Sequence, residues 1–252
     1  MKVRNYFLVI SLLNSFIYSV SVQSQGTLEM EKFYQWFDQS IGVENTGLYD
    51  GIIYIDTYRT INEKTKFYSS PRFLPGSVVY DGQPYSDLEV KYNVFDDELL
   101  VRLPDRLGGV TLQLFKDKVS DFVIDGHLFI NLNNILPETG MNGFYEITFR
   151  DSQLTLLTKH LKKDYARKDR RNLYYEFLDI KKEHVLFYNG AYYVIKSKKD
   201  LISLFPELKN EIDSFYKVAR SLRNSDNDAF MQTLVKRMAS LLNSRSSNDA
   251  VR

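Results

Sequence analysis

The chain has 252 residues, 44% of them apolar and 26% charged, which is the composition of a globular protein and excludes a disordered or fibrous one. Its 33 Lys and Arg balance 32 Asp and Glu, so the sequence gives no global case for nucleic-acid binding. The absence of Cys excludes disulfides, thiolate metal sites and a cysteine nucleophile.

Residues 1–24 predict a secretory signal peptide. Lys2 and Arg4 form a short positive region, Tyr6 to Val22 is mostly apolar, and Val22-Gln23-Ser24 fits a small-residue cleavage site. The alternative is a membrane anchor, but a span needs about 20 predominantly apolar residues, and this stretch is shorter and interrupted by Asn14. We therefore expect export, to the periplasm, to the outer membrane or to the extracellular space.

Residues 25–196 are expected to form a β-rich domain with a leading helix. Behind Thr27, an N-cap residue type, apolar residues recur roughly at helical spacing: Leu28, Phe33, Trp36 and Phe37. From Leu48 to about Ile195 the period changes to two, most clearly in Leu88–Val94. Further candidate strands are Ile52–Tyr58, Leu99–Leu103, Thr111–Phe115, Phe122–Ile124, Leu128–Leu132, Phe144–Phe149, Leu154–Leu157, Leu173–Phe177, Val185–Tyr188 and Ala191–Ile195.

Four short dipeptides between these strands predict hairpin turns: Asp50-Gly51, Asp81-Gly82, Asp125-Gly126 and Asn189-Gly190. Asp-Gly and Asn-Gly accept the positive φ angles of a two-residue type I′ turn. Their spacing is too irregular for propeller blades or a solenoid, so we expect an antiparallel meander.

Residues 197–252 change to a helical pattern. Ser197 with Asp200 resembles a capping box, and Pro206 suits the first turn of a second helix. Two apolar stripes follow, Leu208, Ile212, Phe215, Ala219 and Leu222, then Phe230, Leu234, Met238 and Leu241. We expect a frayed tail from Asn243. The predicted fold class is therefore α+β and mainly β: a twisted antiparallel meander that can curl into a half-barrel, with C-terminal helices packed on the sheet.

Several segments together resemble a family of uncharacterised exported β-rich proteins of the Bacteroidota type. They cover most of the chain after the signal: Asn45–Gly51, Gly76–Tyr85, Leu88–Val94, Asp97–Leu100, Gln113–Phe115, Val119–Phe122, Asn189–Tyr193, Ser197–Asp200 and Phe205–Lys209. Each is mainly a strand with a turn, so the motifs are specific only as a set. The resemblance implies export and a β-rich fold, and it transfers no catalytic or binding residue.

The residue types that carry catalysis or bind metals do not fall into a known pattern. The three His, His127, His160 and His184, lack the spacing of a zinc site, and we assign them no role. No G-x-S-x-G elbow or P-loop occurs. The acidic run Asp96-Asp97-Glu98 lacks the spaced ligands of a calcium loop, so we expect a solvated turn there. A pair of carboxylates for glycoside hydrolysis stays open, because sequence does not show which two face one another. We predict no catalytic residue, metal or cofactor.

The most unusual charge pattern is a cationic run between two candidate strands. It contains Lys159, Lys162, Lys163, Arg167, Lys168, Arg170 and Arg171. Such a cluster attracts phosphate-bearing lipid head groups or acidic polysaccharides. The alternative, which we favour from sequence, is a solvated loop whose charges are screened by salt.

These patterns favour a non-enzymatic exported protein that serves as an accessory or interaction module of the cell envelope. Its expected partner is an envelope protein or a lipid, with peripheral membrane contact and no nucleic acid. The alternative is a periplasmic carrier that binds a lipid or another hydrophobic ligand on a curved sheet lined by Tyr, Phe, Leu and Val. An enzyme is the third and weakest interpretation, and the sequence leaves the oligomeric state open.

Overall fold

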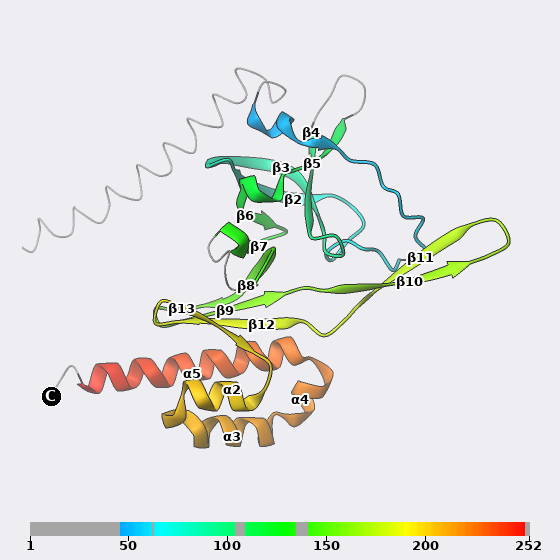
Figure 1. Cartoon of the computed structure of the whole chain (residues 1–252). Helices are drawn as coiled ribbons and strands as arrows, with labels where there is room; N and C mark the ends of the chain where they lie inside the picture. Colours follow the sequence, from blue (N-terminus) through cyan, green and yellow to red (C-terminus); the bar gives the residue numbers. More distant parts are fainter. Residues whose placement is uncertain (1–45, 62, 104–108, 135–140, 250–252) are drawn as a thin grey trace, which may run out of the picture.

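The computed structural model describes residues 46–61, 63–103, 109–134 and 141–249. The predicted signal peptide and the helix after Thr27 lie outside the described residues. Within them the protein is mainly β, with an antiparallel sheet followed by four helices, and this part of the predicted fold class is confirmed (Figure 1).

The sheet contains most of the strands and is not closed. Its order is β1-β5-β4-β3-β2-β6-β7-β8-β9-β12-β13, and β10 and β11 form a separate pair. The strands are β1 (Ile52–Ile53), β2 (Leu74–Tyr80), β3 (Gln83–Asn93), β4 (Glu98–Leu103), β5 (Val110–Gln113), β6 (Val119–Ile124), β7 (His127–Asn131), β8 (Phe144–Arg150), β9 (Leu154–Lys159), β10 (Lys162–Lys168), β11 (Leu173–Asp179), β12 (Glu183–Tyr188) and β13 (Ala191–Ile195).

This order differs from a single meander, because two meanders meet where β2 pairs with β6. After β5 the chain turns through the short 3₁₀ segment Lys116–Lys118 and returns beside β2. Buried Asn131 holds this return, since its side-chain amide donates hydrogen bonds to the carbonyl oxygens of Lys116 (2.7 Å) and Val119 (2.9 Å). A buried polar side chain with satisfied hydrogen bonds specifies the local path of the backbone.

Three of the four predicted hairpin turns are confirmed by their backbone angles. Both residues have positive φ in Asp81-Gly82 (52° and 79°), Asp125-Gly126 (51° and 79°) and Asn189-Gly190 (48° and 77°). The prediction is wrong for Asp50-Gly51. Asp50 ends a 3₁₀ segment, Gly47–Asp50, and Gly51 is extended with φ −66° and ψ 169°.

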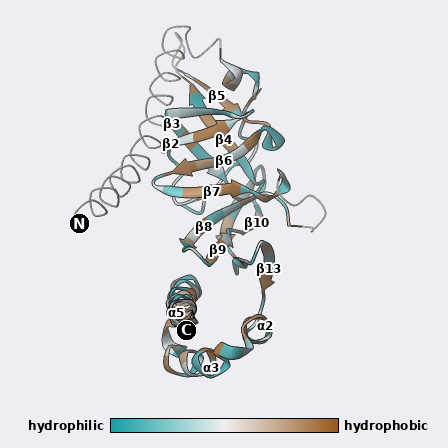
Figure 2. Ribbon diagram, turned by 90° about the vertical axis from the view of Figure 1, so that its left-hand side faces the viewer, coloured by the Kyte–Doolittle hydropathy of each residue, from teal (hydrophilic) through white to brown (hydrophobic). Residues whose placement is uncertain are grey.

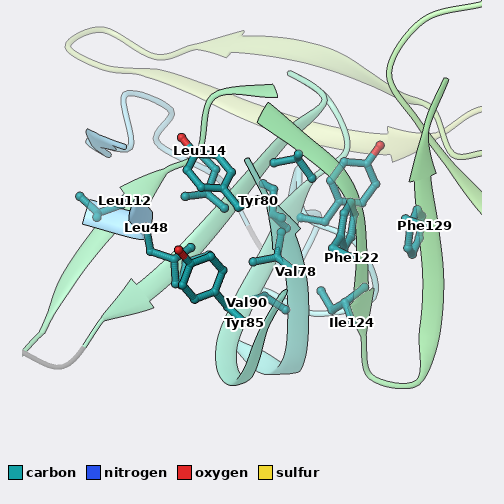
Figure 3. Packing of buried hydrophobic residues seen from close by; sticks show 14 of the residues in the cluster. Leu48, Val78, Tyr80, Tyr85, Val90, Leu112, Leu114, Phe122, Ile124 and Phe129 are labelled. Atoms are coloured by element: carbon teal, nitrogen blue, oxygen red, sulfur yellow. The ribbon is translucent and has the colours of Figure 1, made fainter. Parts of the chain in front are cut away.

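Aromatic and branched side chains fill the inner side of the curled strands (Figure 3). Tyr92, Phe122, Phe129 and Phe144 are each at most 1% exposed. The rings of Phe122 and Phe129 stack with centroids 4.9 Å apart, and both rings contact Tyr92 edge-on. This cluster gives the sheet its dry interior, which stabilises the fold by removing large apolar surfaces from water.

Four helices follow the sheet and cover its last strands (Figures 1 and 2). They are α2 (Lys198–Leu204), α3 (Lys209–Val218), α4 (Arg220–Ser225) and α5 (Asn227–Asp249). Leu156 of β9 and Leu186 of β12 pack in one buried cluster with Leu201, Phe205 and Leu234 of the helical segment. The capping box at the start of α2 is confirmed. Helix α5 continues to Asp249, past the Asn243 where we expected fraying to begin.

Strands β10 and β11 form a long hairpin that extends away from the rest of the molecule (Figure 1). The prediction of a loop between Lys159 and Arg171 is therefore wrong for most of its length. The pairing register places Tyr165 opposite Glu176 and Lys168 opposite Leu173. The sequence of β10 does not alternate between apolar and polar residues, so its strand conformation depends on pairing with β11.

Candidate anion-binding hairpin

The seven cations singled out in the sequence do not form one patch. Lys159 is buried at the base of the hairpin, where its ammonium group donates to the carbonyl oxygen of Asn142 and lies 3.6 Å from Asp97. The side chain of Lys162 is 9% exposed and lies 3.6 Å from Asp179. These two lysines therefore belong to the structure of the domain and are unable to reach an external surface.

Arg167 also has partners, because Glu176 binds it at 3.2 Å and binds Lys64 at 3.1 Å. The hydrogen bond from Lys64, followed by the charge of Arg167, lowers the pKa of the Glu176 carboxyl below its ordinary value. This carboxylate is ionised at neutral pH, and its negative charge opposes the positive charges of Arg167 and Lys64.

Four cations remain exposed and make no ion pair with a carboxylate of the described chain: Lys163, Lys168, Arg170 and Arg171. The last three lie at the tip of the hairpin. Asp169 is next to them, but its carboxylate accepts the backbone N–H groups of Arg171 and Asn172, both at 2.7 Å, and so closes the turn. These backbone hydrogen bonds lower the pKa of Asp169. The tip thus presents an excess of positive charge.

Exposed apolar side chains lie beside these cations. Tyr165 and Leu173 are both 46% exposed. The guanidinium of Arg59 lies 5.7 Å from the ring centroid of Tyr174 and donates a hydrogen bond to Asn172 at 2.7 Å. Cations next to exposed aromatic and aliphatic groups are typical of protein segments that contact the interface of a membrane.

The hairpin is anchored on the body of the protein along β11. The chain before β2 pairs with β11, where the N–H of Tyr175 donates to the backbone carbonyl oxygen of Arg59 (2.9 Å) and the N–H of Phe177 donates to the backbone carbonyl oxygen of Lys64 (3.1 Å). Phe177 is 2% exposed and packs against Tyr58 and Phe95. The chain before β2 thus lies beside β11, and the ring cluster around Phe177 packs beneath it. Together they fix the direction in which the hairpin projects.

Sequence reasoning missed Lys66, which strengthens the same anchor. Its side chain is 2% exposed, and its ammonium group lies 2.9 Å from Asp56 and 4.4 Å from the ring centroid of Tyr58. A buried cation needs such partners, because burial without them is costly. Its neighbours in the sequence are Thr65 and Phe67, and nothing in that pattern distinguishes it from an exposed lysine.

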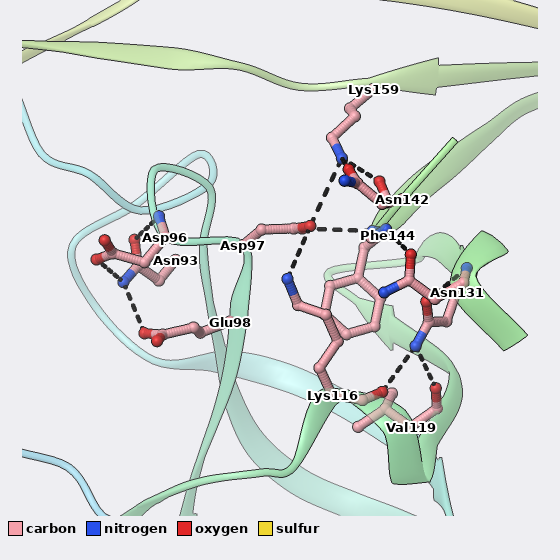
Figure 4. A network of polar contacts seen from close by, with 12 residues as sticks. Asn93, Asp96, Asp97, Glu98, Lys116, Val119, Asn131, Asn142, Phe144 and Lys159 are labelled. Atoms are coloured by element: carbon pink, nitrogen blue, oxygen red, sulfur yellow. Dashed lines mark hydrogen bonds and ion pairs between the residues drawn. The ribbon is translucent and has the colours of Figure 1, made fainter. Parts of the chain in front are cut away.

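The acidic run Asp96-Asp97-Glu98 is only in part the solvated turn we expected. Asp97 lies at the centre of a polar network (Figure 4). Its carboxylate accepts hydrogen bonds from the Tyr92 hydroxyl (2.7 Å) and the Phe144 N–H (3.3 Å), and pairs with Lys116 at 3.1 Å. Asp97 is thereby a structural link between the β3–β4 turn and β8. In the described ranges no cluster of three or more His, Cys, Asp or Glu is arranged to hold a metal ion.

Two of the histidines meet on one carboxylate. Glu146 lies 2.7 Å from Nδ1 of His127 and 2.5 Å from Nε2 of His160. Burial alone would raise the pKa of Glu146, but the hydrogen bonds from His160 and His127 lower it below its ordinary value. The register explains the meeting, since Glu146 pairs with Phe129 on one side and Thr158 on the other. The sequence carries no signal for it, and the arrangement links β7, β8 and the end of β9.

No protein-family model, curated protein or solved structure matches the chain. Among the helices in the described part of the chain, none combines the length and the apolar character needed to cross a bilayer.

Proposed function

We propose that the protein is a non-enzymatic accessory module of the cell envelope, and that it docks on phosphate-bearing lipid head groups through the tip of the β10–β11 hairpin. The observation that carries the proposal is the group of unpaired cations, Lys168, Arg170 and Arg171, at the end of an anchored arm (Figure 1). The predicted signal peptide supports an envelope location.

The expected strength of docking follows from the number of cations. A Lys or Arg near an anionic membrane contributes about 1 kcal/mol, so the three tip cations contribute about 3 kcal/mol. Exposed Tyr165 and Leu173 add apolar contact at the interface. Binding of this strength is reversible and sensitive to salt, which suits peripheral contact rather than permanent anchoring.

The filled interior of the sheet favours an interaction module over a carrier. In this proposal the curled strands are a half-barrel scaffold whose inner side holds Tyr92, Phe122 and Phe129, each buried. A carrier would instead need open apolar space on that side.

The test is vesicle cosedimentation of the purified protein at low and high salt. We expect binding to vesicles of phosphatidylcholine with phosphatidylglycerol, and none to phosphatidylcholine alone. The variant Lys168→Gln/Arg170→Gln/Arg171→Gln should lose this binding. The matched control, Lys209→Gln/Arg220→Gln/Lys236→Gln, removes three exposed cations from the helices and should bind as the parent does.

Equal binding by the two triple variants would refute the role of the hairpin. Binding of the parent to alginate but to neither kind of vesicle would refute the lipid partner and identify an acidic polysaccharide in its place.

A further inference from the structure

A groove lies between the end of the sheet and the helices, on elements that the proposed docking surface does not use. One hollow of about 470 Å³ adjoins a second of about 540 Å³. Both are lined by Lys181, Lys196, Ser197, Tyr216 and Asn227, so the two hollows form one continuous groove. Its size is within the range of sites that hold small organic ligands.

The first hollow has an apolar floor. Tyr145 of β8, Ile195 of β13 and Met231 of α5 line it, and they are 3%, 7% and 4% exposed. Val194 of β13 also lines it and is 37% exposed. A hydrocarbon chain placed on these side chains would be removed from water, which is the main source of affinity for apolar ligands.

The rim of the groove is strongly cationic. Lys182 and Lys198 have carboxylate partners, at 2.5 Å from Asp228 and 2.6 Å from Asp213. Four further cations line the hollows and make no ion pair with a carboxylate in the part of the chain described: Lys181, Lys196, Lys217 and Arg223. Two acidic residues line the hollows, Asp213 in the second and the exposed Glu183 in the first. The positive charge gathers mainly in the second hollow, next to the apolar floor of the first.

Two tyrosines offer hydrogen-bond donors inside the groove. Burial, with smaller contributions from Glu183 and Asp97, raises the pKa of Tyr145 to about 12, so its hydroxyl keeps its proton at neutral pH. Burial also raises the pKa of Tyr216, which lines both hollows. The ring of Tyr216 lies beside Arg223, whose guanidinium is 5.4 Å from the ring centroid. A protonated tyrosine hydroxyl in the lining can donate a hydrogen bond to a ligand that accepts one.

His184 completes the floor without adding charge. It is 4% exposed, and burial, followed by the nearby lysines, lowers its pKa, although Asp228 acts in the opposite direction. Its two ring nitrogens lie 3.3 Å from the Thr158 hydroxyl and 3.2 Å from the side-chain amide of Asn227. A neutral imidazole with both nitrogens occupied positions the start of α5 against the sheet, and leaves the lysines as the source of positive charge.

We propose that this groove binds a single-chain anionic amphiphile, with the hydrocarbon chain on the floor formed by Tyr145, Ile195 and Met231, and with a carboxylate or phosphate head among Lys196, Lys217 and Arg223. Charge complementarity selects the head, because several unpaired cations face one hollow. The buried apolar floor selects the chain, because a free inorganic anion would leave it uncovered.

The test is isothermal titration calorimetry of the purified protein with dodecanoate and with dodecyl phosphate, each below the concentration at which it forms micelles. We expect saturable binding at one site that weakens with added salt, and no saturable binding of the uncharged detergent octyl glucoside. The variant Lys196→Gln/Lys217→Gln should bind about tenfold more weakly, since each near-surface charge contributes up to about 1 kcal/mol. The control Lys209→Gln/Lys236→Gln leaves the groove unchanged and should bind as the parent does.

A second variant tests the floor without disturbing the core. Val194→Asp places a carboxylate in the wall of the groove at a position that is already 37% exposed, and it should abolish binding of both probes while the thermal melt stays close to that of the parent. Tighter binding of one probe identifies the head group, and similar affinities mean that either head is accepted. No saturable binding, or equal binding by the parent and by both groove variants, would overturn the proposal.

Discussion

Gly143 is a position where a single added methyl group should be strongly destabilising. Its φ of +80° lies in the left-handed region, and a Cβ there would overlap the Oδ2 atom of Asp97. That carboxylate is only 17% exposed and is fixed by Lys116, Lys159 and the Tyr92 hydroxyl. Alanine at this position must therefore displace Asp97 from its network (Figure 4).

The expected loss has two parts. The left-handed conformation costs about 1–2 kcal/mol for a residue with a Cβ. Separation of a largely buried carboxylate from its partners costs about 3–5 kcal/mol. We expect Gly143→Ala to lower the free energy of unfolding by about 5 kcal/mol, which for a chain of this size lowers the melting temperature by about 10–20 °C.

The matched control is Gly82→Ala. Gly82 has nearly the same φ, +79°, but a Cβ there meets no atom within 4 Å, so only the backbone penalty of about 1–2 kcal/mol remains. Urea unfolding followed by far-ultraviolet circular dichroism gives both losses. Equal losses for Gly143→Ala and Gly82→Ala would refute the reasoning. In a chain that already carries Asp97→Ala, the penalty of Gly143→Ala should fall to that of Gly82→Ala.

Three further predictions concern pH and helix capping. Because the folded pKa of Glu146 lies below its ordinary value of 4.5, its stabilisation is complete above pH 4.5 and is lost as the pH falls further. Urea midpoints of Glu146→Gln should therefore fall less with acid than those of the parent. The folded pKa of His184 lies below 6.5, so the unfolded chain takes up that proton first and stability declines below pH 6.5; in His184→Gln this decline should be smaller. Asp200→Ala removes a carboxylate that accepts the N–H of Ser197 at 2.7 Å, and urea unfolding should show a loss of about 1 kcal/mol.

Local turn chemistry was visible in the sequence, whereas close packing between distant segments was not. Asp81-Gly82 and Asn189-Gly190 were recognisable because their residue types match the angles of a type I′ turn. Asp50-Gly51 is also an Asp-Gly dipeptide, but its glycine is required by close packing and not by a turn. A Cβ on Gly51 would lie 2.8 Å from the carbonyl oxygen of Gln113, so this glycine permits β1 to approach β5. That reason depends on a pairing between residues far apart in the chain.

The charge pattern of the sequence identified the cationic segment, but the predicted loop is a β-hairpin in the structure. The strand β10 (Lys162–Lys168) carries charges where a strand pattern requires apolar residues, so its sequence reads as a loop. Its order comes from pairing with β11 and from the burial of Phe177 on the other strand. The cationic groove was not predicted, because Lys181, Lys196 and Lys217 come together only when the helices fold back on the sheet.

The position of the hairpin in the chain, between β9 and β12, bears on the order in which the chain folds. Most of the ladders in the described sheet join strands that are consecutive in the sequence, such as β3 with β4 and β7 with β8, and such local pairs form quickly. The β9–β12 ladder must wait until the chain has passed through β10 and β11, since Lys159 pairs with Glu183 across the whole arm. Formation of the hairpin brings these two ends together and reduces the entropy lost when the loop closes. The arm that presents positive charge to its surroundings therefore also shortens the loop that closes when β9 pairs with β12.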